Sequence, residues 1–205
     1  APDNNVIYFA SNRTGSVQVW RMNADASDQK QVTREAGGLP LSVSPDGEWL
    51  YFHHEMDRTL WRISTRSSEE QIVLNKQKSF FALSPDTSQV SFGETINGEK
   101  FVVVHSLTSG QTVKTFKYAQ PDGNLMGVAL MPDGKGVAYI LATEEYRKNT
   151  LWHQSFDAKP PRKIADLNTE QIAQLQGFAL TPDGKSFAVA QGGWLHDAVL
   201  LKGLK

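Results

Sequence analysis

A short turn sequence recurs five times along this chain of 205 residues. Its copies are Ala1-Pro2-Asp3-Asn4, Ser44-Pro45-Asp46-Gly47, Ser84-Pro85-Asp86-Thr87, Met131-Pro132-Asp133-Gly134 and Thr181-Pro182-Asp183-Gly184. Proline presets φ, aspartate accepts hydrogen bonds from nearby backbone N–H groups, and glycine tolerates positive φ. The prolines lie 40 to 50 residues apart, which is typical of a repeat architecture. We interpret the fullest copies as structural turns: Pro45, Asp46, Gly47, Pro132, Asp133, Gly134, Pro182, Asp183 and Gly184.

The residues between these turns predict an all-β array of four-stranded antiparallel blades, as in a β-propeller. β-Branched and aromatic runs bounded by Asn, Asp, Ser and Gly are typical of strands. Runs such as residues 49–52 and 137–141 are apolar on both faces, which favours sheets covered on both sides by other sheets. A β-sandwich predicts cleaner alternation and no fixed period. We predict one domain with repeats over approximately residues 1–37, 38–77, 78–124, 125–174 and 175–205.

The two end units are predicted to be incomplete. The first unit has no inner strand before residue 6, and the fifth has no outer strand after residue 201. We expect an open arc that is part of a larger propeller, in preference to an imperfectly closed ring of five blades. An arc exposes an apolar blade face at each end, so self-association is expected. Residues 169–175 are compatible either with a short helix or with a loop.

Composition excludes some classes of partner. The formal charge is −1, which gives no electrostatic basis for binding nucleic acid or an anionic membrane. No apolar run approaches the length of a transmembrane helix, so no direct membrane insertion is expected. Cysteine is absent, which rules out disulfides and thiol catalysis.

The repeats resemble the PD40 repeats of the TolB-like β-propeller family. In the first unit the resemblance rests on Tyr8-Phe9, on residues 11–15, on residues 20–25 and on Gln31-Val32-Thr33. The third unit departs from it, with Thr87 in place of glycine. Residues 171–201 resemble the C-terminus of bacterial signalling proteins that carry such propellers after a kinase or winged-helix domain. That resemblance implies a sensor or interaction module in the periplasm.

The hairpin tips opposite the Pro-Asp turns are the predicted binding face, because functional loops gather on rigid scaffolds. We expect a ligand or partner to contact the polar and aromatic residues of these loops, namely His54, Glu55, Arg58, Glu144, Arg147, Trp194 and His196. His53 and His54 point to opposite faces if their strand continues, and the other histidines lie on other blades. A metal needs two or more converging ligands, so no metal and no cofactor are predicted.

The sequence contains no catalytic signature that identifies an enzyme. It has no Gly-x-Ser-x-Gly elbow, phosphate loop or His-Glu-x-x-His motif. We therefore expect a non-catalytic binding or sensor propeller that engages an unidentified protein or small-molecule ligand. The alternative is an enzyme acting on carbohydrate, a glycosidase or a polysaccharide lyase. Carboxylates such as Glu55, Asp57, Glu144 and Glu145 would then have to approach one another across a glycosidic bond.

Overall fold

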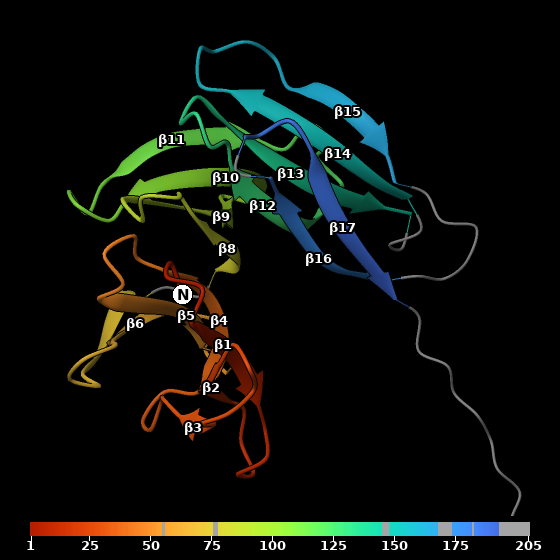
Figure 1. Ribbon diagram of the computed structural model, residues 1–205. Helices are drawn as coiled ribbons and strands as arrows, with labels where there is room; N and C mark the ends of the chain where they lie inside the picture. Colours follow the sequence, from red (N-terminus) through yellow and green to blue (C-terminus); the bar gives the residue numbers. More distant parts are fainter. Residues whose placement is uncertain (55, 76–77, 145–147, 168–173, 182, 193–205) are drawn as a thin grey trace, which may run out of the picture.

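The computed structural model describes residues 1–54, 56–75, 78–144, 148–167, 174–181 and 183–192. They form five antiparallel sheets, which follow one another along the chain (Figure 1). The first sheet contains β1 (Val6–Ser11), β2 (Gln18–Asn23) and β3 (Lys30–Gln31), and the second contains β4 (Gly38–Val43), β5 (Trp49–His54), β6 (Leu60–Ser64) and β7 (Glu70–Leu74). The third contains β8 (Ser79–Leu83), β9 (Gln89–Ile96), β10 (Glu99–Ser106) and β11 (Thr112–Lys117). The fourth contains β12 (Asn124–Leu130), β13 (Gly136–Thr143), β14 (Lys148–Ser155) and β15 (Arg162–Asp166), and the fifth contains β16 (Gln174–Leu180) and β17 (Phe187–Gly192).

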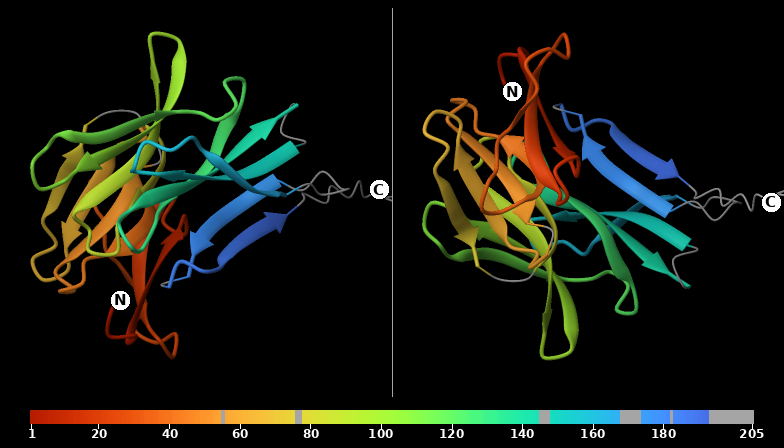
Figure 2. Two further views of the ribbon diagram at one scale, coloured as in Figure 1. Left: turned by 90° about the horizontal axis from the view of Figure 1, so that it is seen from above. Right: turned by 90° about the horizontal axis from the view of Figure 1, so that it is seen from below.

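This arrangement confirms the predicted all-β architecture of antiparallel blades. The first strand of each later sheet is its inner strand, and β4, β8, β12 and β16 contact one another in succession. The sheets therefore stand side by side in a curved array, which Figure 2 shows from two sides. Residues 174 and 175 belong to β16, and the rest of the segment considered for a helix lies outside the described residues, as do residues 198–201. Among the described residues, no helix is long and apolar enough to cross a membrane.

An aromatic pair marks the same register position in three sheets. Phe9 lies opposite Trp20, Phe52 opposite Trp61, and Tyr139 opposite Trp152, each pair joining the second strand of a blade to the third. Trp61 and Trp152 pack against the buried clusters beside their sheets. The three tryptophans thus occupy equivalent positions of the repeat, and two of them pack against a core cluster.

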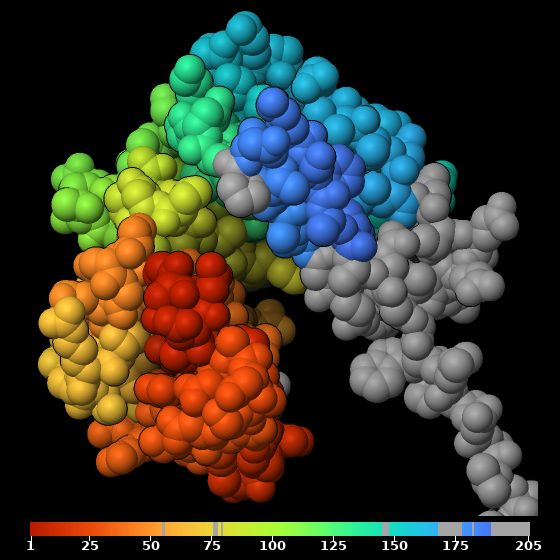
Figure 3. All heavy atoms as spheres, viewed as in Figure 1, coloured from red at the N-terminus to blue at the C-terminus, as the bar shows by residue number. Residues whose placement is uncertain are grey.

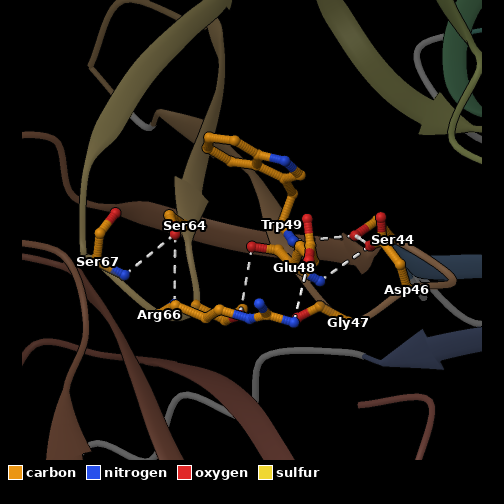
Figure 4. Close-up of polar contacts among 9 residues, drawn as sticks. Ser44, Asp46, Gly47, Glu48, Trp49, Ser64, Arg66 and Ser67 are labelled. Atoms are coloured by element: carbon orange, nitrogen blue, oxygen red, sulfur yellow. Dashed lines mark hydrogen bonds and ion pairs between the residues drawn. The ribbon is translucent and has the colours of Figure 1, made fainter.

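In the second to fifth sheets, the Pro-Asp turns connect the inner strand to the second strand. In the second sheet the Ser44 hydroxyl donates to Asp46 Oδ1 at 2.5 Å, and Asp46 Oδ1 also accepts the Glu48 N–H at 2.9 Å (Figure 4). These two hydrogen bonds lower the pKa of Asp46. The neighbouring β6–β7 hairpin lies at the same end of the sheet, because the Thr65 N–H donates to the Glu48 carbonyl at 3.0 Å.

The last residue of each described turn adopts the left-handed conformation. Gly47, Gly134 and Gly184 have φ of 73°, 68° and 67°. Thr87 takes the glycine position of the third unit with φ of 55°, although it has a side chain. Asp133 accepts the N–H of the residue two positions later, Lys135, at 3.0 Å. Asp46 and Asp183 likewise accept the N–H groups of Glu48 and Lys185. Pro182 lies outside the described residues; the other residues predicted to form these turns do form them.

Each pair of neighbouring sheets encloses an apolar cluster. Val19, Leu50, Phe52 and Ile63 lie between the first and second sheets, and Leu60, Phe81, Val90 and Phe92 between the second and third. Val102, Leu125, Val137 and Tyr139 lie between the third and fourth, and Ala138, Ile140, Leu151 and Phe178 between the fourth and fifth. A single sheet leaves both of its faces open to water. The hydrophobic core therefore forms where neighbouring sheets stack against each other.

Exposure at one repeat position changes with the place of the sheet in the array. The residue five positions after the turn proline is 1% exposed at Leu50 and fully buried at Val90 and Val137. Its equivalents in the end sheets, Ile7 and Phe187, are 42% and 37% exposed. Among the described residues no sheet precedes Ile7, so Ile7 places apolar surface at the first end of the array, which is the feature behind the self-association predicted from the sequence. That association itself stays a prediction.

Replacing Gly134 by valine should destabilise the protein by more than ~1 kcal/mol, because a β-branched residue is strained at positive φ. A Cβ atom at Gly134 would meet no atom within 4 Å apart from those of its chain neighbours. The loss of stability would therefore come from backbone strain and not from a steric clash. Asparagine tolerates this conformation, so Gly134→Asn is the matched control and should cost clearly less. The measurement is the free energy of unfolding in urea. Equal stability of Gly134→Val and the parent protein would contradict the assigned turn.

Candidate functional site

The β5–β6 hairpin tip carries a connected polar network at the end of the sheet opposite the Pro-Asp turns. His54 Nδ1 lies 2.7 Å from Asp57 Oδ1. The same oxygen accepts the Thr59 N–H at 3.0 Å and the Thr59 hydroxyl at 2.5 Å. The Thr59 hydroxyl oxygen in turn accepts the Trp61 Nε1–H at 2.8 Å. A ring nitrogen, a carboxylate, a hydroxyl and an indole are therefore held in fixed relative positions.

Asp57 is the centre of this network and its carboxylate stays ionised. Partial burial raises its pKa, but hydrogen bonds from Thr59 and His54 outweigh that effect, and the net pKa is lowered. Its side chain is about half exposed. The tip thus presents a fixed, solvent-accessible negative charge next to an imidazole.

The backbone of this tip is fixed by its neighbours. Arg58 has φ of 54°, the left-handed conformation that is uncommon for a residue with a side chain. The Arg58 N–H donates to the His54 carbonyl at 3.1 Å, and the Arg58 carbonyl accepts the Lys78 N–H at 3.1 Å. The tip is therefore attached to the chain segment that enters the third sheet.

That segment brings a buried ion pair beside the tip. Lys78 Nζ pairs with Glu94 Oε1, and the two side chains are only 8% and 25% exposed. The ammonium group also lies 5.4 Å from the centre of the Phe92 ring. Removing two charges from water costs free energy unless the ion pair has good geometry and further hydrogen bonds. Core packing alone therefore gives no reason for a charged pair at this position.

Aromatic rings lie beside both the network and the ion pair. The His54 and Trp61 rings are 6.2 Å apart, and the His53 ring meets Phe81 edge to face at 5.3 Å. Phe81 in turn meets Phe92 edge to face at 5.9 Å. We call His54, Asp57, Arg58, Lys78 and Glu94 the tip site.

The structure places three of the seven residues predicted to bind a ligand. His54 and Arg58 belong to the tip site. Glu144 lies at the β13–β14 tip with φ of 50°, and its carboxylate pairs with Lys148 at 2.5 Å. Glu55, Arg147, Trp194 and His196 lie outside the described residues. The side-chain contacts of His54 and Glu144 described above are made within their own hairpins, and the predicted binding face stays a prediction.

Sequence reasoning missed Lys78 and Glu94. The sequence did contain a sign of the pair: Lys78 comes directly before the apolar strand β8, and Glu94 lies in β9 after its buried residues. In the part of the chain that the structure describes, no three histidine, aspartate or glutamate side chains form a group that could hold a metal ion.

Removing one partner of the Lys78–Glu94 pair should destabilise the protein. Lys78→Met leaves a mostly buried carboxylate without its cation, at an expected cost of roughly 2–3 kcal/mol in unfolding free energy. The matched control is Lys148→Met in the exposed Glu144–Lys148 pair, which should change stability by less than about 0.5 kcal/mol. Urea unfolding of both variants measures the difference. Equal effects at the two pairs would show that burial of the first pair has no energetic consequence.

Comparison with known proteins supports the fold and leaves the activity open. No protein-family model matches the chain. The uncharacterized protein Atu1656 of Agrobacterium fabrum is 41% identical over 54 residues, which is 25% of this chain and 18% of that protein. A match of that extent does not establish a family.

Three solved structures share the arrangement of sheets. A candidate TolB of Agrobacterium tumefaciens superposes with a TM-score of 0.66 at 13% identity, over 82% of this chain and 64% of that one. TolB of Acinetobacter baumannii gives 0.65 at 16% identity, over 90% and 46%. Hydrazine synthase of Kuenenia stuttgartiensis gives 0.66 at 20% identity, over 93% and 53%. This chain therefore spans about half to two thirds of the length of those proteins and shares with them a TolB-like β-propeller fold.

Proposed function

We propose that this chain is a non-catalytic β-propeller module that binds a protein or small-molecule ligand through its hairpin-tip face. The observation that carries the proposal is the tip site, where a fixed carboxylate, an imidazole and a guanidinium-bearing residue lie beside a buried ion pair. Rigid strands with charged loops at their ends are a common basis for recognition. The apolar core clusters hold the strands in place, so the loops are positioned before a ligand arrives.

The wider setting of the proposal is a bacterial signalling protein with its propeller in the periplasm. Its support is the resemblance of the repeats, and of residues 171–201, to propellers in such proteins. The shared fold supports the scaffold but not the role, because one fold hosts unrelated functions.

The tip face should lose binding when its side chains are removed. The chain would be immobilised and screened with a displayed random peptide library and an array of oligosaccharides. For any ligand selected, the triple variant Arg58→Ala, Arg147→Ala and Trp194→Ala should weaken affinity at least about tenfold, because these side chains supply charge and aromatic contact. Asp25→Ala, in the β2–β3 turn at the other end of the first sheet, is the control and should bind as the parent does.

Two outcomes would contradict the proposal. Binding that survives the triple variant but fails in Asp25→Ala would move the binding face to the opposite end of the sheets. Steady release of unsaturated or reducing sugars from polygalacturonate by the parent chain would favour the carbohydrate enzyme, and it would overturn the non-catalytic assignment.

A further inference from the structure

The β5–β6 tip exposes a methionine to solvent almost completely. Met56 is 87% exposed, whereas the other exposed large apolar side chains of the described residues lie between 37% and 48%. It stands two positions before Arg58, which is also exposed. A single exposed apolar residue needs no explanation, but methionine and arginine are both enriched in protein–protein interfaces. The two side chains together therefore indicate a contact surface at this tip.

The backbone that carries these two side chains is already ordered in the protein alone. Asp57 Oδ1 accepts the Thr59 N–H and hydroxyl, and it lies 2.7 Å from His54 Nδ1. Arg58 keeps a left-handed φ of 54°, a strained conformation that persists only where the surroundings impose it. Its N–H and its carbonyl are both hydrogen-bonded. A loop ordered in this way loses little conformational freedom on binding, which favours affinity.

The next hairpin provides a second apolar side chain beside this tip. The Arg58 carbonyl accepts the Lys78 N–H, and Lys78 Nζ pairs with Glu94 in β9. Side chains alternate between the two faces of a strand, so Ile96, two positions after Glu94, lies on the same face of β9. Ile96 is 40% exposed. Figure 2 shows the β9–β10 hairpin projecting from the array, and Figure 3 shows the second unit (orange to yellow) directly against the third (yellow to green).

We propose that the surface formed by Met56, Arg58 and Ile96, called the Met56–Ile96 surface, binds an acidic segment of a partner protein. An apolar side chain of that segment packs against Met56 and Ile96, and a carboxylate beside it pairs with the Arg58 guanidinium group. The inference rests on the proposed binding function and names its partner as a polypeptide. An oligosaccharide would offer hydroxyl groups, and no aliphatic side chain, to the two apolar residues.

Charge complementarity selects an acidic partner. Three carboxylates of the described hairpins at this end of the sheets are already paired with lysines, namely Glu94 with Lys78, Glu99 with Lys117 and Glu144 with Lys148. Within the described residues, the Arg58 guanidinium group has no hydrogen bond or ion pair. A guanidinium group binds a carboxylate through two parallel hydrogen bonds. A partner carboxylate would therefore give this tip the kind of ion pair that the neighbouring tips have.

The first measurement asks whether a segment of this protein itself covers the surface. Hydrogen peroxide converts methionine to its sulfoxide, and peptide mass mapping of the full chain follows the reaction at each position. Met56 should react before the partly buried Met22, Met126 and Met131. Protection of Met56 in the chain alone would assign the surface to a segment of this protein, or to a second copy if protection rises with protein concentration. Either result would overturn the proposal.

The second measurement selects peptides from a displayed random library on the full chain and on Arg58→Glu. Peptides enriched on the parent chain should carry Asp or Glu beside Leu, Ile, Met or Phe. Arg58→Glu should instead enrich peptides with Lys or Arg at that place. The matched control is Arg66→Glu, which changes an exposed arginine in the β6–β7 hairpin, at the other end of the sheet, and should enrich the same peptides as the parent.

Two further variants measure the apolar contact. Met56→Ser and Ile96→Ser should each weaken affinity for the selected peptides about tenfold. Ile164→Ser, which changes a 39% exposed isoleucine in β15, is the matched control and should bind as the parent does.

The outcomes separate this inference from the proposed function. Enriched peptides without acidic residues, or affinity that is insensitive to both Met56→Ser and Ile96→Ser, would overturn the inference. If those peptides still lost affinity in Arg147→Ala or Trp194→Ala, the tip face would remain the binding face. A library that yields no peptide for the parent chain would overturn the polypeptide partner, whereas binding of an oligosaccharide would still satisfy the proposed function.

Discussion

The burial of one apolar position between neighbouring sheets is the constraint on which the rest of the structure depends. Leu50, Val90 and Val137 occupy the same place in three successive blades, and each is removed from water by the sheet before it. Since every blade is apolar on both faces, none can be stable alone. Hydrophobic burial therefore acts between repeats, as in other repeat proteins, and each sheet depends on its neighbours.

The two ends of the sheets carry different kinds of loop. At one end of each sheet, the Pro-Asp turns use their side chains on their own backbone, as Ser44 and Asp46 do. At the other end, the hairpin tips have no repeated turn chemistry. There His54 and Asp57 form a local network beside the Lys78–Glu94 pair. At this tip, polar side chains that the repeat does not require therefore contact one another.

The sequence predicted the strands and turns well because their signals are local. Glycine or asparagine at positive φ, proline before aspartate and β-branched runs each act within a few residues. Thr87 departs from the repeat in sequence but keeps the left-handed conformation of the glycines. The Lys78–Glu94 pair was not predicted. It forms only when β8 pairs with β9 and the Arg58 carbonyl accepts the Lys78 N–H, and such contacts depend on register between strands.

The most direct test compares two equivalent residues in different surroundings. Leu50→Ala and Ile7→Ala remove side chains at the same repeat position, one between two sheets and one at the end of the array. Urea unfolding should show a loss of roughly 3 kcal/mol for Leu50→Ala, within the usual range for a buried leucine, and less than about 1 kcal/mol for Ile7→Ala. Equal losses at the two positions would contradict the claim that stacking between sheets holds this fold together.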